Sequence, residues 1–97
     1  MIREVAHVTV LPDHKDQFEA ALRTAVDDVL SQANGMIAFT GVGWCVERPN
    51  VYLFTIDWES LEAHTIGFRA SELFTQWRSL IGPHFDGAPI VEHFVLN

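Results

Sequence analysis

The stretch Val51-Tyr52-Leu53-Phe54-Thr55-Ile56-Asp57-Trp58 decides the fold of this 97-residue chain. Its β-branched and aromatic residues are typical of a strand. An antiparallel strand with one face in water would alternate apolar and polar residues, and this stretch does not. The run Met36-Ile37-Ala38-Phe39 also fails to alternate. Both segments therefore predict strands that are buried on their two faces.

A helix is predicted before these strands. Its apolar residues recur at three- and four-residue spacing: Phe18, Leu22, Ala25, Val29 and Ala33. This spacing places them on one face of a helix. Asp13 is the expected N-cap, and Asn34-Gly35 is the expected stop because both residues tolerate a left-handed backbone.

A second helical region follows the strands. Ser60 is expected to cap it, Gly67 weakens it, and Ser71 restarts it before Gly82-Pro83 ends it. The predicted strands span residues 4–10, 36–47, 51–58 and 90–96. The resulting order is βαββαβ, which predicts one α+β domain of the ferredoxin-like type over residues 1–97. Such a domain has a four-stranded antiparallel sheet with two helices on one face.

Two helices can cover only one face of that sheet. The other face is also apolar in the stretches quoted above, so it needs a partner surface. We expect it to pack against the sheet of a second copy, which makes a homodimer the predicted assembly. The composition agrees, because 48% of the residues are hydrophobic and the chain holds seven Phe and three Trp. A ligand pocket lined with aromatics is the other way to bury such a surplus.

The charge balance excludes several classes of partner. Thirteen acidic and six basic residues give a net charge of −7, so the basic stripe that nucleic acid binding requires is absent. An anionic membrane surface would also repel the chain. No apolar run reaches the ~18 residues of a membrane span, and the single Cys45 cannot form an internal disulfide. The sequence therefore predicts a cytoplasmic protein.

Three segments resemble one known family. The run Trp58-Glu59-Ser60-Leu61-Glu62-Ala63-His64 is similar to the W-x-S-x-E-A-H segment of antibiotic-biosynthesis monooxygenase domains. Val8-Thr9-Val10-Leu11-Pro12 with Phe18 resembles their first strand and helix opening, and Pro89-Ile90-Val91-Glu92-His93-Phe94 resembles their last strand. The resemblance covers nearly the whole chain. It implies a dimeric α+β barrel, in which two sheets pack face to face.

The resemblance also implies a chemistry. The family's oxygenases use no metal, flavin or haem, and they oxidise phenolic or anthrone-like aromatics with dioxygen. The substrate loses a proton in a water-poor pocket, and its anion reacts with oxygen. Trp58 matches a tryptophan that lines the pocket of anthrone oxygenases, and His64 matches a histidine of quinol-oxidising relatives. Ala6 stands where both the anthrone oxygenases and the haem-degrading relatives carry an asparagine, so this chain departs from both, and haem degradation is not expected.

The candidate catalytic residues are His64 and His93. His64 lies one helical turn before Phe68, so the two side chains share a face, and an unperturbed histidine titrates close to neutrality. His93 follows Glu92 on a strand, so one of the two faces the helices and the other the dimer side. Each histidine also has a structural interpretation. His64 could bond a backbone carbonyl at a helix margin, and His93 could make a polar contact at the dimer seam.

Five aromatic residues are the candidate substrate-binding residues: Trp58, Phe68, Trp77, Phe74 and Trp44. Such rings could form a pocket wall for a planar substrate or could fill the core, since each buries a large apolar area. Core filling is the favoured interpretation for Trp77 and Trp44, and the pocket wall is favoured for Trp58. No metal-binding spacing and no phosphate-binding loop is present, so neither a metal nor a cofactor is expected.

The leading functional hypothesis is a cofactor-independent monooxygenase that oxidises a small planar phenol, quinol or polyketide-like aromatic. Two alternatives would use the same pocket. One is a dimeric small-molecule-binding or stress-response module without turnover, because this fold hosts many functions. The other is a non-oxidative isomerase, which also needs a base in a dry cavity.

Overall fold

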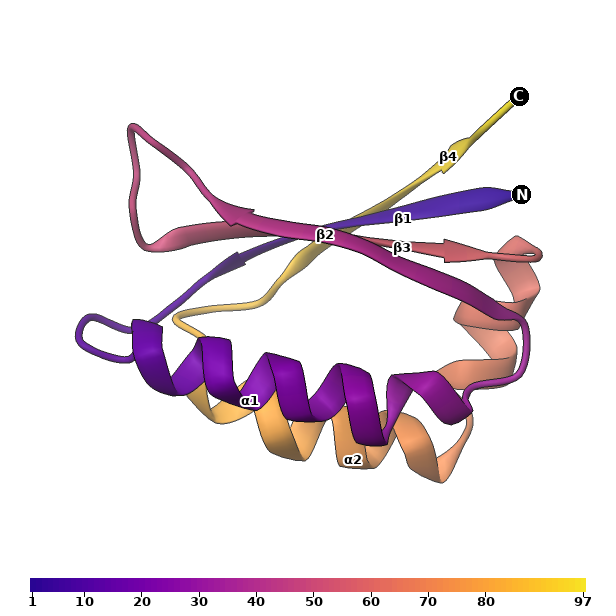
Figure 1. Ribbon diagram of the computed structural model, residues 1–97, viewed down its shortest axis with the longest axis horizontal. Helices are drawn as coiled ribbons and strands as arrows, with labels where there is room; N and C mark the ends of the chain where they lie inside the picture. The colour runs from indigo at the N-terminus through magenta and orange to yellow at the C-terminus, as the bar shows by residue number, and fades with distance from the viewer.

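The computed structural model describes residues 1–97 as a four-stranded antiparallel sheet with all helices on one of its faces (Figure 1). The strands are β1 (Ile2–Thr9), β2 (Met36–Trp44), β3 (Val51–Trp58) and β4 (Ile90–Val95). The helices are α1 (Lys15–Asp28) and α2 (Glu72–Ile81), with shorter segments η1 (Leu30–Gln32), η2 (Ala63–Phe68) and η3 (Gly82–His84). None of these helices combines the length and the apolar character needed to cross a bilayer.

β1 and β3 form the centre of the sheet, whose strand order is β2-β3-β1-β4. β1 pairs antiparallel with both neighbours, so Glu4 lies opposite Ile56 of β3 and His93 of β4. Ala6, two residues along β1, lies opposite Phe54. Because facing residues share a side of the sheet, these side chains converge on the helix-covered face. The ferredoxin-like α+β arrangement predicted from the sequence is confirmed.

The core lies between the sheet and the two main helices. The sheet contributes almost wholly buried side chains at alternate positions of β1 and β3: Ala6, Val8, Tyr52, Phe54, Ile56 and Trp58. The helices contribute Phe18, Leu22, Ala25, Trp77 and Ile81. The two-residue period of the strands and the 3.6-residue period of the helices therefore meet in one apolar layer.

The opposite face of the sheet has no helix over it (Figure 1). Leu53, Ile90 and Phe94 lie on this face and are 39%, 63% and 49% exposed. Beside them, Arg3 donates two hydrogen bonds to the Asp57 carboxylate, at 2.7 and 2.9 Å. The uncovered face of β3 therefore carries Val51 and Leu53 beside Thr55 and Asp57, so it is apolar only in part, less than the sequence indicated. A single chain covers only the other face.

α1 differs from the predicted helix at both ends. Asp13 has a left-handed φ of 66° and is not the N-cap; His14 occupies that position without a side-chain hydrogen bond. The helix ends at Asp28, and η1 follows as a separate 3-10 turn. Val29 and Ala33 nevertheless remain buried, because the tighter turn still directs them toward the sheet. The apolar spacing therefore predicted burial correctly and the helix boundary incorrectly.

Ser60 and Gly35 fix the position of η2, Ser60 as a helix cap and Gly35 by its close approach to Ala63. The Ala63 N–H donates to Ser60 Oγ at 3.1 Å, so Ser60 caps this region as expected. Gly35, just before β2, has a φ of 81°. A Cβ at that position would lie 2.7 Å from the Ala63 Cβ. Only glycine permits both this conformation and this close approach.

Candidate active site

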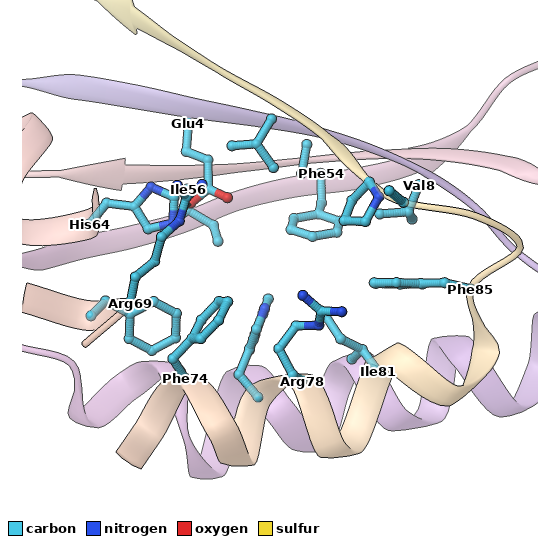
Figure 2. Close-up of a pocket in the computed structure, with 16 residues that line it drawn as sticks. Glu4, Val8, Phe54, Ile56, His64, Arg69, Phe74, Arg78, Ile81 and Phe85 are labelled. Carbon is cyan, nitrogen blue, oxygen red and sulfur yellow. Dashed lines mark ion pairs between the residues drawn. The ribbon is translucent and has the colours of Figure 1, made fainter. Parts of the chain in front are cut away.

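A cavity of about 530 Å³ lies between the helix-covered face of the sheet and the segment formed by η2 and α2. Figure 2 shows Glu4 and Ile56 of the sheet on one side of it, and Phe74 and Ile81 of α2 on the other. Eleven of its sixteen lining residues are hydrophobic. Small-molecule sites have volumes and linings of this kind, so the cavity can hold a small planar ring system.

The conformation of η2 turns two side chains toward this cavity. η2 is a π-helical turn, in which the Arg69 N–H donates to the His64 carbonyl, five residues back, at 3.1 Å. His64 and Phe68 both face the sheet, are 3% and 4% exposed, and have ring centroids 6.2 Å apart. Wide turns of this type are rare and occur often at functional sites.

Four side chains form a connected polar chain at one end of the cavity. Trp58 Nε1 donates to Glu4 Oε1 at 3.0 Å, and His64 Nε2 lies 3.3 Å from the same oxygen. His64 Nδ1 lies 2.7 Å from His93 Nε2. The Trp58 ring also stacks on His64, with centroids 4.9 Å apart and an interplanar angle of 21°. Glu4 therefore contacts His64, and His64 contacts His93. Trp58 contacts both Glu4 and His64.

Burial disfavours charge on this polar chain. It raises the pKa of Glu4 from 4.5 to about 7, against the lowering effects of the Trp58 hydrogen bond and of Arg69. It lowers the pKa of His64 from 6.5 to about 3, and Arg69 and His93 lower it further. The pKa of His93 is also lowered, by burial and by Arg69. The imidazole of the Glu4–His64 contact is therefore neutral at neutral pH, so the contact is not an ion pair.

The second carboxyl oxygen of Glu4 is available to a ligand. Trp58 and His64 both contact Oε1. No fully buried side-chain nitrogen or oxygen lacks a partner, so Oε2, which has none, is not sealed inside the protein. Figure 2 shows the carboxyl group directed into the cavity. Both ring nitrogens of His64 are engaged within the protein, which leaves Glu4 as the group that can accept a proton from a ligand.

The chain is similar to known proteins over most of its length. The model of the antibiotic biosynthesis monooxygenase family matches residues 1–80. The chain belongs to this family. The match confirms the resemblance that the Trp58-to-His64 run carries in the sequence.

Relatives of this family share both sequence and fold with the chain. It is 35% identical over 94 residues, 97% of each sequence, to "Uncharacterized protein YczJ" of Bacillus subtilis (strain 168). It is 31% identical to a "putative antibiotic biosynthesis monooxygenase" of Bordetella bronchiseptica, with a TM-score of 0.92 over 99% of this chain and 96% of that one. A protein of the same description from Caulobacter crescentus CB15 shares the fold, with 22% identity and a TM-score of 0.78 over 96% of this chain and 86% of that one.

Most of the residues that the sequence singles out gather at the cavity of this family member. Four of them line it: His64, Phe68, Phe74 and Trp77. His93 lies behind His64 and contacts its ring. Trp58 is wholly buried and does not line the cavity; it supports Glu4 and His64 from behind.

Trp44 lies away from the cavity. It ends β2 at the edge of the sheet and is 57% exposed. The Lys15 ammonium lies 4.9 Å from its ring centroid, and the Trp44 and Tyr52 rings meet at 6.3 Å. Its position fits neither the wall of this cavity nor the core filling expected from the sequence, because an edge strand gives it one neighbouring strand only.

Sequence reasoning missed Glu4, although a signal for it was present. Ala6, Val8 and Val10 are wholly buried at alternate positions of one strand. Glu4 continues this series two residues earlier, so the alternation places a carboxylate on the apolar face. A carboxyl group buried in this way has a raised pKa and is a candidate functional residue.

The polar chain is not arranged as a metal site. Glu4, His64 and His93 point at one another in succession and not at a common point. No group of three or more histidine, cysteine or carboxylate side chains in the structure is placed to hold a metal ion. The arrangement suits proton transfer, for which a succession of hydrogen-bonded titratable groups is appropriate.

Proposed function

We propose that this protein is a cofactor-independent monooxygenase that oxidises a small planar phenol, quinol or polyketide-like aromatic with dioxygen. The observation that carries the proposal is the Glu4 carboxyl group, which lines an apolar cavity and has a pKa of about 7. A base of that pKa is matched to removing a proton near neutral pH, and a water-poor cavity keeps the resulting anion reactive. Membership of the antibiotic biosynthesis monooxygenase family supports oxygen as the second substrate.

The proposed reaction starts when the substrate hydroxyl gives its proton to Glu4 Oε2. Dioxygen then bonds to a hydrogen-bearing ring carbon ortho or para to that oxygen, and the peroxide formed there is protonated. Loss of the proton on that carbon and of hydroxide, together one water, breaks the O–O bond and leaves a carbonyl. A phenol and O₂ thus give a quinone and water. The substrate supplies all four electrons, so no external reductant is required.

We assign positioning roles to the two candidate histidines. His64 contacts Glu4 Oε1 from one side and Trp58 from the other, an arrangement that keeps Oε2 directed at the ligand. His64 also connects Glu4 to His93, which is only partly buried. The accepted proton can leave the cavity along these contacts toward His93.

The aromatic residues of η2 and α2 are the proposed binding wall for the substrate ring. Phe68 packs edge-on against Phe74 and Trp77, with ring centroids 5.6 and 6.2 Å apart. All three line the cavity. Flat apolar surfaces at right angles hold a planar ring by both stacking and edge contacts.

We propose that the protein works as a homodimer through the uncovered face of the sheet. Leu53, Ile90 and Phe94 leave apolar surface exposed on this face. Large apolar side chains exposed on a sheet face that no helix covers are typical of an interaction site. A second copy would bury it by packing sheet against sheet about a two-fold axis.

Oxygen consumption tests the proposed function. Purified protein is mixed with a panel of quinols, naphthols and anthrones in an oxygen electrode, and products are identified by mass spectrometry. We expect one O₂ to be consumed for each product, with loss of uptake in Glu4→Gln. Glu62→Gln is the matched control, since Glu62 is exposed and lies outside the cavity. Isomerised product without oxygen uptake, or binding without any product, would contradict the oxygenase proposal.

A further inference from the structure

Two arginine side chains reach the cavity without a carboxylate partner. Arg69 follows η2 and Arg78 lies on α2, and both are among the residues that line the cavity. The structure contains two contacts between basic and acidic side chains at ion-pair distance, Arg3–Asp57 and His64–Glu4, and neither involves these arginines. Both residues are exposed, and Lys15, Arg23 and Arg48 also lack a carboxylate partner. Arg69 and Arg78 differ from those three because they line the cavity.

The two guanidinium groups occupy different parts of the cavity. Figure 2 shows Arg69 reaching toward the Glu4–His64 end and Arg78 projecting from α2 toward the middle. The electrostatic effect of Arg69 on the pKa of Glu4, of His64 and of His93 agrees with this placement. The Arg78 guanidinium carbon lies 6.0 Å from the Phe74 ring centroid, so the aromatic wall helps to hold it in place.

We infer that the ligand of this cavity is a hydroxylated aromatic that also carries a carboxylate group, with the carboxylate bound by Arg78 and the hydroxyl placed between Glu4 and Arg69. The inference rests on the proposed function and narrows its substrate class. The apolar walls bind the ring, and the two polar ends fix its direction. The ligand hydroxyl then lies at the base, and its fixed negative charge lies away from the base.

The chemistry of guanidinium favours this assignment. Arginine presents donors in a planar fork that matches a carboxylate in a bidentate fashion. An overall charge of −7 opposes the approach of an anion, so recognition of an anion requires local positive charge in the cavity. Arg69 would also stabilise the phenolate that forms when Glu4 accepts the hydroxyl proton.

Calorimetric titration with two matched probes tests the inference. The probes are 2-naphthol and 6-hydroxy-2-naphthoate, which differ by one carboxylate at the far end of the ring from the hydroxyl. We expect the wild-type protein to bind the naphthoate about tenfold more tightly, the effect of one charge-assisted hydrogen-bonded contact. Arg78→Gln should abolish this preference, because the naphthoate loses the partner of its carboxylate. Arg48→Gln, in the exposed loop before β3, should keep the preference.

The outcomes separate this inference from the proposed function. Equal affinity of the wild-type protein for the two probes, or a preference that survives in Arg78→Gln, would overturn the carboxylate assignment while leaving oxygenation of neutral phenols possible. Binding of neither probe would show that the cavity does not take hydroxylated aromatics, and would overturn the proposed function as well. Preference lost in Arg78→Gln and retained in Arg48→Gln would support the inference.

Discussion

Glu4 Oε1 lies 3.3 Å from His64 Nε2, and burial moves the pKa values of the two groups in opposite directions, to about 7 and about 3. The order expected for a carboxyl and an imidazole in water is thereby reversed. The carboxyl group becomes the stronger base of the pair. This reversal supports the proposed roles of Glu4 as proton acceptor and of His64 as positioning residue, whereas the sequence alone favoured His64 as the base.

Replacing Glu4 by glutamine should change the pH dependence of stability. The folded-state pKa of Glu4 is raised to about 7 from 4.5, so the folded protein holds a proton that the unfolded chain has lost between these values. Wild-type stability should therefore lose a contribution as pH rises through this window. Glu4→Gln carries no such titration and should gain on the order of 2 kcal/mol relative to wild type between pH 5 and pH 8. Urea unfolding at fixed protein concentration measures this; a difference that does not vary with pH would contradict the buried, protonated carboxyl.

The titration of His64 should make stability depend on pH in the opposite sense: the free energy of unfolding should fall as the pH is lowered. Its folded-state pKa is lowered to about 3 from 6.5, so between these values the unfolded chain binds a proton that the folded protein does not. Stability from this group is present above pH 6.5 and is lost as pH falls through the window. Nitrogen-detected NMR of the folded protein should show a neutral His64 ring at pH 5. A charged ring at that pH would contradict the assignment.

Replacing Trp58 by phenylalanine, which removes the indole N–H donor, should change the pKa of Glu4 and leave the fold intact. Trp58→Phe keeps a ring against His64 and deletes the hydrogen bond from Nε1 to Glu4 Oε1. Because that bond lowers the pKa of Glu4, its loss should raise this pKa and move the acid limb of the pH–rate profile upward. We expect the lost hydrogen bond to cost about 1 kcal/mol of stability, and the cavity left by the smaller ring at this wholly buried position to add to that cost. An unshifted profile with reduced turnover would indicate a purely structural role for Trp58.

A charge on the uncovered face of the sheet should dissociate the dimer. Leu53 is 39% exposed on that face, and Leu61, which lies outside the sheet between β3 and η2, is 40% exposed. Leu53→Glu should give a monomer by sedimentation or light scattering, since a buried unpaired charge at an interface is strongly unfavourable. Leu61→Glu should remain dimeric. A wild-type protein that is itself monomeric at micromolar concentration would contradict the proposed assembly.

The strands and the fold could be predicted from the sequence because their signals are local. The β-branched and aromatic residues of β3 and the one-faced spacing around Phe18 depend only on neighbouring residues. The end of α1 at Asp28 and the π-helical turn of η2 could not be predicted, since both depend on packing against other elements. Gly35 illustrates this: its φ of 81° suits a stop signal, but its contact with Ala63 is visible only in the fold.

The candidate site could be predicted only in part. His64 and Phe68 were found because helical spacing places them on one face. The sequence could not show that Trp58 is sealed behind the cavity while Phe68 lines it, because residues that fill a core and residues that line a pocket have the same pattern in one dimension. Glu4 could have been found by extending the buried alternation of β1 by two residues.

The most direct test of the central claim is the ionisation of a bound naphthol in the absence of oxygen. The claim is that Glu4 Oε2 removes the hydroxyl proton before oxygen reacts. Excess wild-type protein mixed anaerobically with a naphthol at pH 7 should produce the red-shifted absorption of naphtholate. When oxygen is admitted, this absorption should disappear as product forms. Glu4→Gln should bind the naphthol without this absorption. Equal naphtholate formation in Glu4→Gln, or oxygen uptake that persists in it, would contradict the account.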